Sequence, residues 1–255
     1  MDGKHAMGGE PMEFTYKGYE SLVQCLREED YCFCRYDNVY DQDRTVIMRH
    51  DIDLSLDKAV QMAELEHRLG IASTYFVLLA TSFYNVSSRE AYHKVRRIIA
   101  LGHEVGLHFD EERYAIHTAE DFQECIMKEV DILSNVLDHR VSVMSMHRPS
   151  RKALESDLQL PGVINSYASS FFNQMKYVSD SRMHWREDVF GIIQRNEFNR
   201  LHILTHPFWY SSDEETMETK LRRFLHQATV ERYNDLYSNF RNLDEVIKKE
   251  SLYAY

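Results

Sequence analysis

Segments rich in β-branched and aromatic residues alternate with amphipathic segments along most of the chain. The alternation predicts strands at 45–48, 71–79, 104–109, 141–146 and 201–205, and helices at 14–29, 55–69, 88–101 and 119–138. The less regular remainder predicts short strands at 162–167, 175–179 and 190–195, and a long charged helix at 213–249. Because strand–helix–strand alternation needs parallel strands with helices packed outside them, we expect an α/β fold.

No internal repeat and no linker interrupts this pattern, so we expect one folded domain. The first residues carry no apolar core of the kind a secretory signal needs. We therefore expect a flexible extension at 1–12 and a single domain at 13–255.

Charge and composition narrow the class of protein. Acidic residues number 41 and basic residues 30, which gives a formal net charge of −11. This balance argues against nucleic-acid binding, because non-specific binding of a polyanion rests on surplus Lys and Arg. The longest apolar run, Tyr75–Ala80, is far shorter than the roughly 20 residues that cross a bilayer. Four cysteines in 255 residues indicate reduced thiols rather than a disulfide framework, and we expect a cytoplasmic protein.

Polar side chains capable of metal binding or proton transfer follow four of the predicted strands. They are His50, Asp51 and Asp53, then His108 and Asp110, then His147 and Arg148, and finally His206. One such residue at one strand end is usually structural, with its hydrogen bonds satisfied. All four together favour a site, because the carboxyl ends of parallel strands converge. Imidazole and carboxylate groups suit zinc or a similar divalent ion.

The same segments resemble the signature blocks of the NodB-homology polysaccharide deacetylases, the metal-dependent sugar amide hydrolases of carbohydrate esterase family four. The blocks are RHDID at 49–53, GHEVGLH ending at His108, His-Arg-Pro at 147–149 and the strand end at His206. They keep the family's order between Val46 and Pro207. The resemblance implies a single-domain distorted β/α barrel that removes an acyl group from a carbohydrate, with 13–255 as the catalytic domain.

The RHDID block resembles the family's paired-aspartate motif, with one residue between the two acids. By this resemblance Asp51 is the general base and Asp53 a metal ligand. Residues two apart in a strand point to the same side, so both carboxylates can face one site. The alternative is that Asp53 caps the helix beginning near Ser55.

The GHEVGLH block resembles the family's GHEIGNH, which implies that His108 is a metal ligand. The family places a second metal histidine four residues later, where this chain has Glu112. Glu112, Asp110 or His147 could replace it. The ligand set we favour is Asp53, His108 and His147, with an open position for water. The expected cofactor is one divalent metal ion, with zinc favoured.

The resemblance implies further roles near these blocks. Arg148 resembles the arginine that holds the base aspartate, so its guanidinium would keep Asp51 ionised. The alternative is a surface arginine at a strand end. His206 resembles the histidine that protonates the leaving amine. The aromatic side chains expected to contact a sugar, unless they belong to the core, are Trp185, Trp209 and Tyr210.

Together these residues predict hydrolysis of an amide. A divalent ion lowers the pKa of its bound water from near 15.7 toward about 7. Asp51 would take the proton as water attacks the carbonyl carbon, and His206 would protonate the departing nitrogen. The expected partner is an amino sugar or a glycan intermediate of surface-polysaccharide biosynthesis, with acetate released.

Two other classes remain open. One is a different metal-dependent amidohydrolase or phosphoesterase on a β/α barrel, although such enzymes often carry an HxH pair where this chain has HDID. The other is a degenerate, non-catalytic barrel that binds sugar. The absence of a histidine at position 112 favours this second class.

Overall fold

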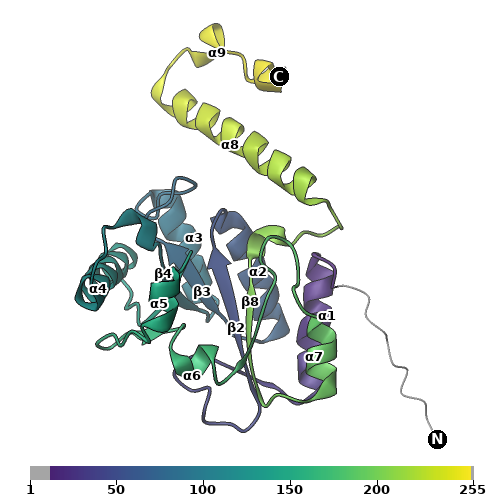
Figure 1. Cartoon of the computed structure of the whole chain (residues 1–255). Helices are drawn as coiled ribbons and strands as arrows, with labels where there is room; N and C mark the ends of the chain where they lie inside the picture. The colour runs from purple at the N-terminus through teal and green to yellow at the C-terminus, as the bar shows by residue number, and fades with distance from the viewer. Residues whose placement is uncertain (1–11, 254–255) are drawn as a thin grey trace, which may run out of the picture. The chain divides into compact units, whose positions relative to one another are not determined.

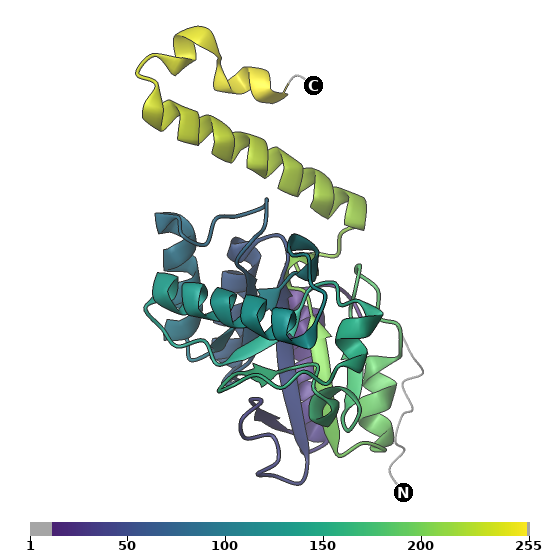
Figure 2. The ribbon, with the colours of Figure 1, turned by 60° about the vertical axis from the view of Figure 1, so that its left-hand side comes forward.

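The computed structural model describes residues 12–253, which form two compact units divided between Ser212 and Asp213. The first unit is built on an eight-stranded sheet in which every strand pair is parallel. Helices surround this sheet (Figures 1 and 2). The expected α/β class is therefore confirmed.

The strands of the sheet lie between residues 32 and 205. They are β1 (Cys32–Cys34), β2 (Thr45–Ile52), β3 (Thr74–Leu78), β4 (Glu104–Phe109), β5 (Val143–Met146), β6 (Ile164–Asn165), β7 (Lys176–Ser179) and β8 (Arg200–Thr205). Their order is β6-β5-β4-β3-β2-β8-β7, with β1 paired to the first half of β2. Because β6 and β7 are the two edges, the sheet is a partial barrel that is open between them.

In the first unit, helix α1 precedes the sheet, and from β2 onward helices alternate with the strands along the chain. They are α1 (Tyr16–Glu28), α2 (Leu56–Leu69), α3 (Arg89–Ala100), α4 (Ala119–Leu137), α5 (Arg151–Glu155), α6 (Ser169–Phe172) and α7 (Val189–Arg195), with 3-10 turns η1 (Glu111–Arg113) and η2 (Pro207–Trp209). Helix α2 shows how its ends are specified. The Ser55 side chain accepts the Lys58 N–H at the start, and Gly70 ends the helix in the left-handed conformation. Ser55, not Asp53, is thus the N-cap.

Strand β2 separates two cores. Val46, Met48 and Ile52 pack into the larger core together with side chains of the surrounding helices. Ile47 points the other way, into a smaller core inside the partial barrel with Phe76. All eight residues of β2 are buried, so the polar residues of this strand are buried too, on one face or the other.

The structure corrects one predicted element. Residues 190–195 were expected to form a strand, but they belong to helix α7. Asp188 caps this helix by accepting the Gly191 N–H, and Asn196 ends it in the left-handed conformation. The buried positions Val189, Ile192 and Ile193 repeat at helical spacing, which a strand would place on opposite faces.

The structure describes the two ends of the predicted domain in part, and the domain boundaries stay a prediction. Residues 1–11 of the expected extension lie outside the described residues, but Met12 is buried in the larger core. The second unit contains α8 (Met217–Asn239), α9 (Leu243–Val246) and η3 (Lys249–Tyr253), so the predicted domain at 13–255 spans both units. Among residues 12–253, no helix combines the length and apolarity needed to span a membrane.

A buried histidine inside the barrel predicts a pH-dependent stability. The His202 ring is fully buried, with Nε2 2.7 Å from the Tyr36 hydroxyl oxygen. Burial and the nearby charge of Arg49 lower the pKa of His202 from 6.5 to about 3. Below about pH 6.5 the unfolded chain therefore binds a proton that the folded ring does not bind, so the free energy of unfolding decreases as the pH is lowered through this window.

We expect His202→Gln to make this pH dependence shallower, by up to about 1.4 kcal/mol per pH unit between about pH 4.5 and 6.5. Urea denaturation of both proteins at several pH values in this range measures the difference. Equal slopes would show that the ring titrates normally in the folded protein.

Candidate metal and proton-transfer site

Three side chains from different strand ends converge at the carboxyl edge of the sheet. Asp53 follows β2, His108 lies in β4 and His147 directly follows β5. Asp53 Oδ1 is 3.2 Å from both His108 Nε2 and His147 Nδ1, and these two nitrogens are 3.2 Å apart. The three potential ligand atoms thus face a common point. These are the residues of the favoured ligand set, and their role as metal ligands stays a prediction.

Neighbouring groups position the His108 ring and the backbone of His147. Ser145 Oγ is 2.7 Å from His108 Nδ1, which directs the opposite nitrogen of that ring toward Asp53. The backbone N–H of His147 donates to the Phe109 carbonyl at 2.8 Å. A hydrogen bond to the other ring nitrogen is the usual way in which a protein orients a metal-binding histidine.

The triad also has the chemistry of a metal site. Asp53 Oδ1 is buried and has no hydrogen-bond donor among the described residues, although both imidazole nitrogens lie close to it. Buried oxygens in proteins are nearly always satisfied, so an orphaned carboxylate oxygen beside two nitrogen ligands fits a cation. Burial raises the pKa of Asp53, but His108 and His147 outweigh this and hold it well below its usual range.

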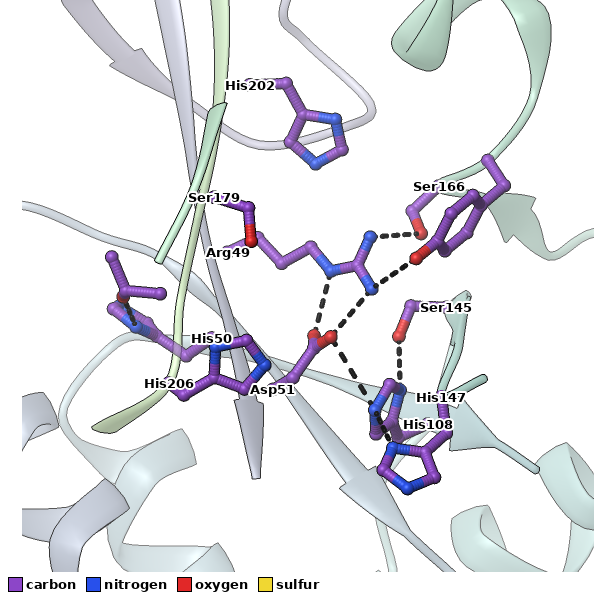
Figure 3. Close-up of polar contacts among 12 residues, drawn as sticks. Arg49, His50, Asp51, His108, Ser145, His147, Ser166, Ser179, His202 and His206 are labelled. Atoms are coloured by element: carbon purple, nitrogen blue, oxygen red, sulfur yellow. Dashed lines mark hydrogen bonds and ion pairs between the residues drawn. The ribbon is translucent and has the colours of Figure 1, made fainter. Parts of the chain in front are cut away.

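Asp51 lies beside the triad and is held by an arginine from its own strand. Arg49 Nε is 2.8 Å from Asp51 Oδ1, and Nη2 is 2.8 Å from Oδ2. Figure 3 shows Asp51 between the Arg49 guanidinium and the rings of His108 and His147. Burial raises the pKa of Asp51, but the charge of Arg49 and its hydrogen bonds outweigh burial, so the pKa lies below its usual value and the carboxylate stays ionised. Its Oδ2 is 3.6 Å from His108 Nε2.

This geometry corrects the role predicted for Arg148. Its guanidinium pairs with Asp110 at 2.7 Å and with Glu112 at 2.8 Å, and the side chain is 54% exposed. Arg49 holds Asp51 instead. The signal was present in the sequence, because residues 49 and 51 are two apart in a predicted strand and therefore share a face. Since Arg148 engages both Asp110 and Glu112, the structure favours His147 over either acid as the third ligand.

His206 lies across the site from the imidazole pair. Its Nε2 is 3.8 Å from Asp53 Oδ2, and its Nδ1 is 2.6 Å from Asp180 Oδ1. Asp180 is fully buried at the end of β7, and it also accepts the His206 backbone N–H and the Tyr210 hydroxyl. Burial lowers the pKa of His206, but Asp180 outweighs it and raises the pKa to about 9. Asp180 therefore favours the protonated form of the ring.

Sequence reasoning did not assign Asp180 a role. The available signal was its position, because Asp180 directly follows the strand predicted at 175–179. Its distance of 26 residues from His206 concealed the contact, which exists because β7 and β8 are paired neighbours.

The three aromatic residues expected to contact a sugar differ in position. Tyr210 is fully buried and packs edge-on against Tyr19, so the prediction that it contacts substrate is wrong. Trp209 is half-buried and is the last residue of η2, the turn that begins directly after His206. Trp185 is also half-buried, and its Nε1 has no hydrogen-bond partner among the described residues. Substrate contact by the two tryptophans stays a prediction.

Comparison with known proteins gave structural matches only. No family model matches the chain, and no curated protein matches it. A carbohydrate esterase family 4 pseudoenzyme from Bacillus anthracis is 13% identical, with a TM-score of 0.43 over 73% of this chain and 62% of that chain. A family 4 esterase of Streptococcus mutans is 12% identical, with a TM-score of 0.48 over 80% of this chain and 85% of that chain.

A third solved structure is the Streptococcus pyogenes deacetylase PplD in complex with acetate. It is 12% identical, with a TM-score of 0.44, and the match covers 80% of this chain and 87% of that chain. This chain spans less than two thirds of the length of the B. anthracis protein.

The geometry predicts which variant loses metal. We expect wild-type protein to bind about one Co²⁺ per chain and His147→Ala to lose tight binding, because one of three ligands is removed. Glu112→Ala should retain binding, since its carboxylate pairs with Arg148 outside the triad. Titration with Co²⁺, followed by its visible absorption, measures both affinities. Loss of metal in Glu112→Ala with retention in His147→Ala would contradict the assignment.

A milder change tests how the triad is supported. Ser145→Ala removes the group that orients His108, so we expect the Co²⁺ affinity to fall about 10- to 100-fold. The fold should persist, because only one hydroxyl is removed. Circular dichroism serves as the control, and an unchanged affinity would show that the ring needs no such support.

Proposed function

We propose that the protein is a metal-dependent hydrolase that removes an N-acetyl or similar acyl group from an amino sugar. The observation that carries this proposal is the convergence of a possible metal triad, a carboxylate of lowered pKa and a histidine of raised pKa at one edge of the sheet. Metal-assisted amide hydrolysis uses a group of each kind. The motif resemblance supports a carbohydrate as the substrate.

Asp53, His108 and His147 would hold the ion. A divalent ion bound there supplies a water of lowered pKa and an electrophile for the amide carbonyl oxygen. Zinc is the metal we propose, because two imidazoles and one carboxylate form a common catalytic zinc set that leaves a position open.

Asp51 fits the role of general base. The bidentate contact with Arg49 fixes the carboxylate and keeps it ionised, and the group lies next to the triad. As water attacks the carbonyl carbon, Asp51 accepts the proton that the water loses. Arg49 itself stays charged, because a guanidinium is not deprotonated in proteins.

His206 fits the role of general acid. Asp180 holds its Nδ1, which leaves Nε2 facing the site, close to Asp53. When the C–N bond breaks, the imidazolium donates its Nε2 proton to the departing nitrogen, and the neutral ring remains bonded to Asp180. The products are a carboxylate and a free amino sugar.

A panel of N-acetylated amino sugars tests the proposed function. The panel contains free, oligomeric and nucleotide-linked forms, because the surface-polysaccharide role we propose would use a glycan intermediate. Zn²⁺-loaded protein should release acetate and free amine in equal amounts from at least one form. Asp51→Asn is the control and should not do so. Phosphate release from phosphorylated sugars without acetate would favour a phosphoesterase.

A second candidate function rests on position 112. Glu112, where the family has a metal histidine, is paired with Arg148 and is not one of the three residues of the triad. A protein that has lost its metal would keep only sugar binding. Calorimetric binding of an N-acetyl amino sugar, with no acetate release and no bound metal, would establish this function.

A matched pair of arginine variants tests the base. Arg49→Lys loses the bidentate contact with Asp51, so we expect acetate release to fall about 100-fold or more. Arg148→Lys should stay close to wild type, because Arg148 contacts other acids at an exposed position. Initial rates at saturating substrate compare the two. Equal losses would show that the assignment of Arg49 is wrong.

A further inference from the structure

A second buried polar cluster lies on the outer face of β2, where it contacts neither the metal triad nor Asp51. Its centre is the fully buried carboxylate of Glu66 in α2. Four side chains donate hydrogen bonds to this carboxylate: Tyr19, His50, Ser73 and Tyr75. We refer to these five residues as the Glu66 cluster. Burial raises the pKa of Glu66, but His50 and the other donors lower it to about 2, so the group is an anion.

One branch of the cluster leads toward the site. His50 Nε2 is 2.9 Å from Glu66 Oε1, and His50 Nδ1 is 2.7 Å from the Thr205 hydroxyl oxygen. An ionised carboxylate only accepts, so Nε2 carries the hydrogen that bonds to it. With Nε2 held by Glu66, the other ring nitrogen, Nδ1, faces the Thr205 hydroxyl and shares a hydrogen bond with it. Glu66 thereby orients the His50 ring toward Thr205.

This branch lies directly behind the proton-transfer groups. His50 and Thr205 are partners in the register of β2 and β8. The next residue after His50 is Asp51, and the next after Thr205 is His206, which keeps an extended backbone beyond the end of β8. Successive residues of an extended chain point to opposite faces. The hydrogen bond between His50 and Thr205 therefore joins the two strands at the point where the general base and general acid emerge on the other face.

We propose that Glu66 is a positioning residue for His206. Through His50 and Thr205 it holds the carboxyl end of β8 against β2, and this fixes the place of the His206 ring relative to Asp51 and Asp53. Apolar side chains could fill the same space, but they would not fix the strand ends as directional hydrogen bonds do. The inference rests on the proposed function, in which these groups transfer protons.

Variants at the two ends of the branch, Glu66→Gln and Thr205→Val, test this role. The primary readout is the ¹H–¹⁵N correlation signals of the His206 ring in metal-free protein, assigned by their loss in His206→Gln. We expect both variants to shift these signals. We also expect each to lower kcat for acetate release about 10- to 100-fold, with KM and Co²⁺ affinity close to wild type.

Matched controls separate positioning from stability. Tyr75→Phe removes a hydrogen bond to the same carboxylate on a branch that does not reach Thr205, so it should leave the His206 signals in place. Thr205→Ser keeps the hydroxyl and should restore the wild-type signals and kcat. The double variant should match the larger single effect, because both changes break one chain of contacts.

Two outcomes would overturn the proposal. One is that Glu66→Gln and Thr205→Val lower only the melting temperature and leave the His206 signals unchanged. The other is that Tyr75→Phe shifts those signals as much as Glu66→Gln does. The spectra need no substrate, so they distinguish the two hypotheses. Expected shifts in a protein that releases no acetate would refute the proposed function while supporting the coupling of Glu66 to His206.

Discussion

The buried contact between Arg49 and Asp51 is the interaction on which the interior of the partial barrel depends. Both side chains come from β2, an interior strand of the sheet, and the guanidinium has no exposed surface. Two charges removed from water are tolerated only when each has the other as a well-oriented partner. The same guanidinium lies over the rings of Phe76 and Tyr167, so the ion pair also determines what packs around it.

The two faces of β2 carry polar residues that belong to different networks. On the inner face, Arg49 and Asp51 lie next to the metal triad, while on the outer face His50 reaches the Glu66 carboxylate. Consecutive residues can serve the two faces because successive side chains of a strand point to opposite sides of the sheet. A motif that reads as one cluster in the sequence therefore serves two separate polar networks in the structure.

Much of the fold and part of the site could be predicted from the sequence. The strand–helix alternation and the strand ends at Asp53, His108 and His147 were visible because they depend on local periodicity and on the convergence of parallel strands. Contacts between distant segments were not visible. Asp180 reaches His206 only because β7 pairs with β8, and residues 189–195 form a helix because Asp188 caps them. Arg148 was misassigned because adjacency to a motif does not fix the direction of a side chain.

The opening between β6 and β7 gives the partial barrel a property that closed barrels lack. In a closed barrel, the number of strands and their stagger determine the diameter. In this protein, Arg49 extends from β2 toward Ser166 and Tyr167, just beyond β6, and the rings of Tyr167, Phe172 and Tyr177 form a chain of contacts to β7. The width of the partial barrel's interior therefore depends on the sizes of these few side chains. Substitutions among them can widen or narrow the interior while every hydrogen bond between paired strands stays intact.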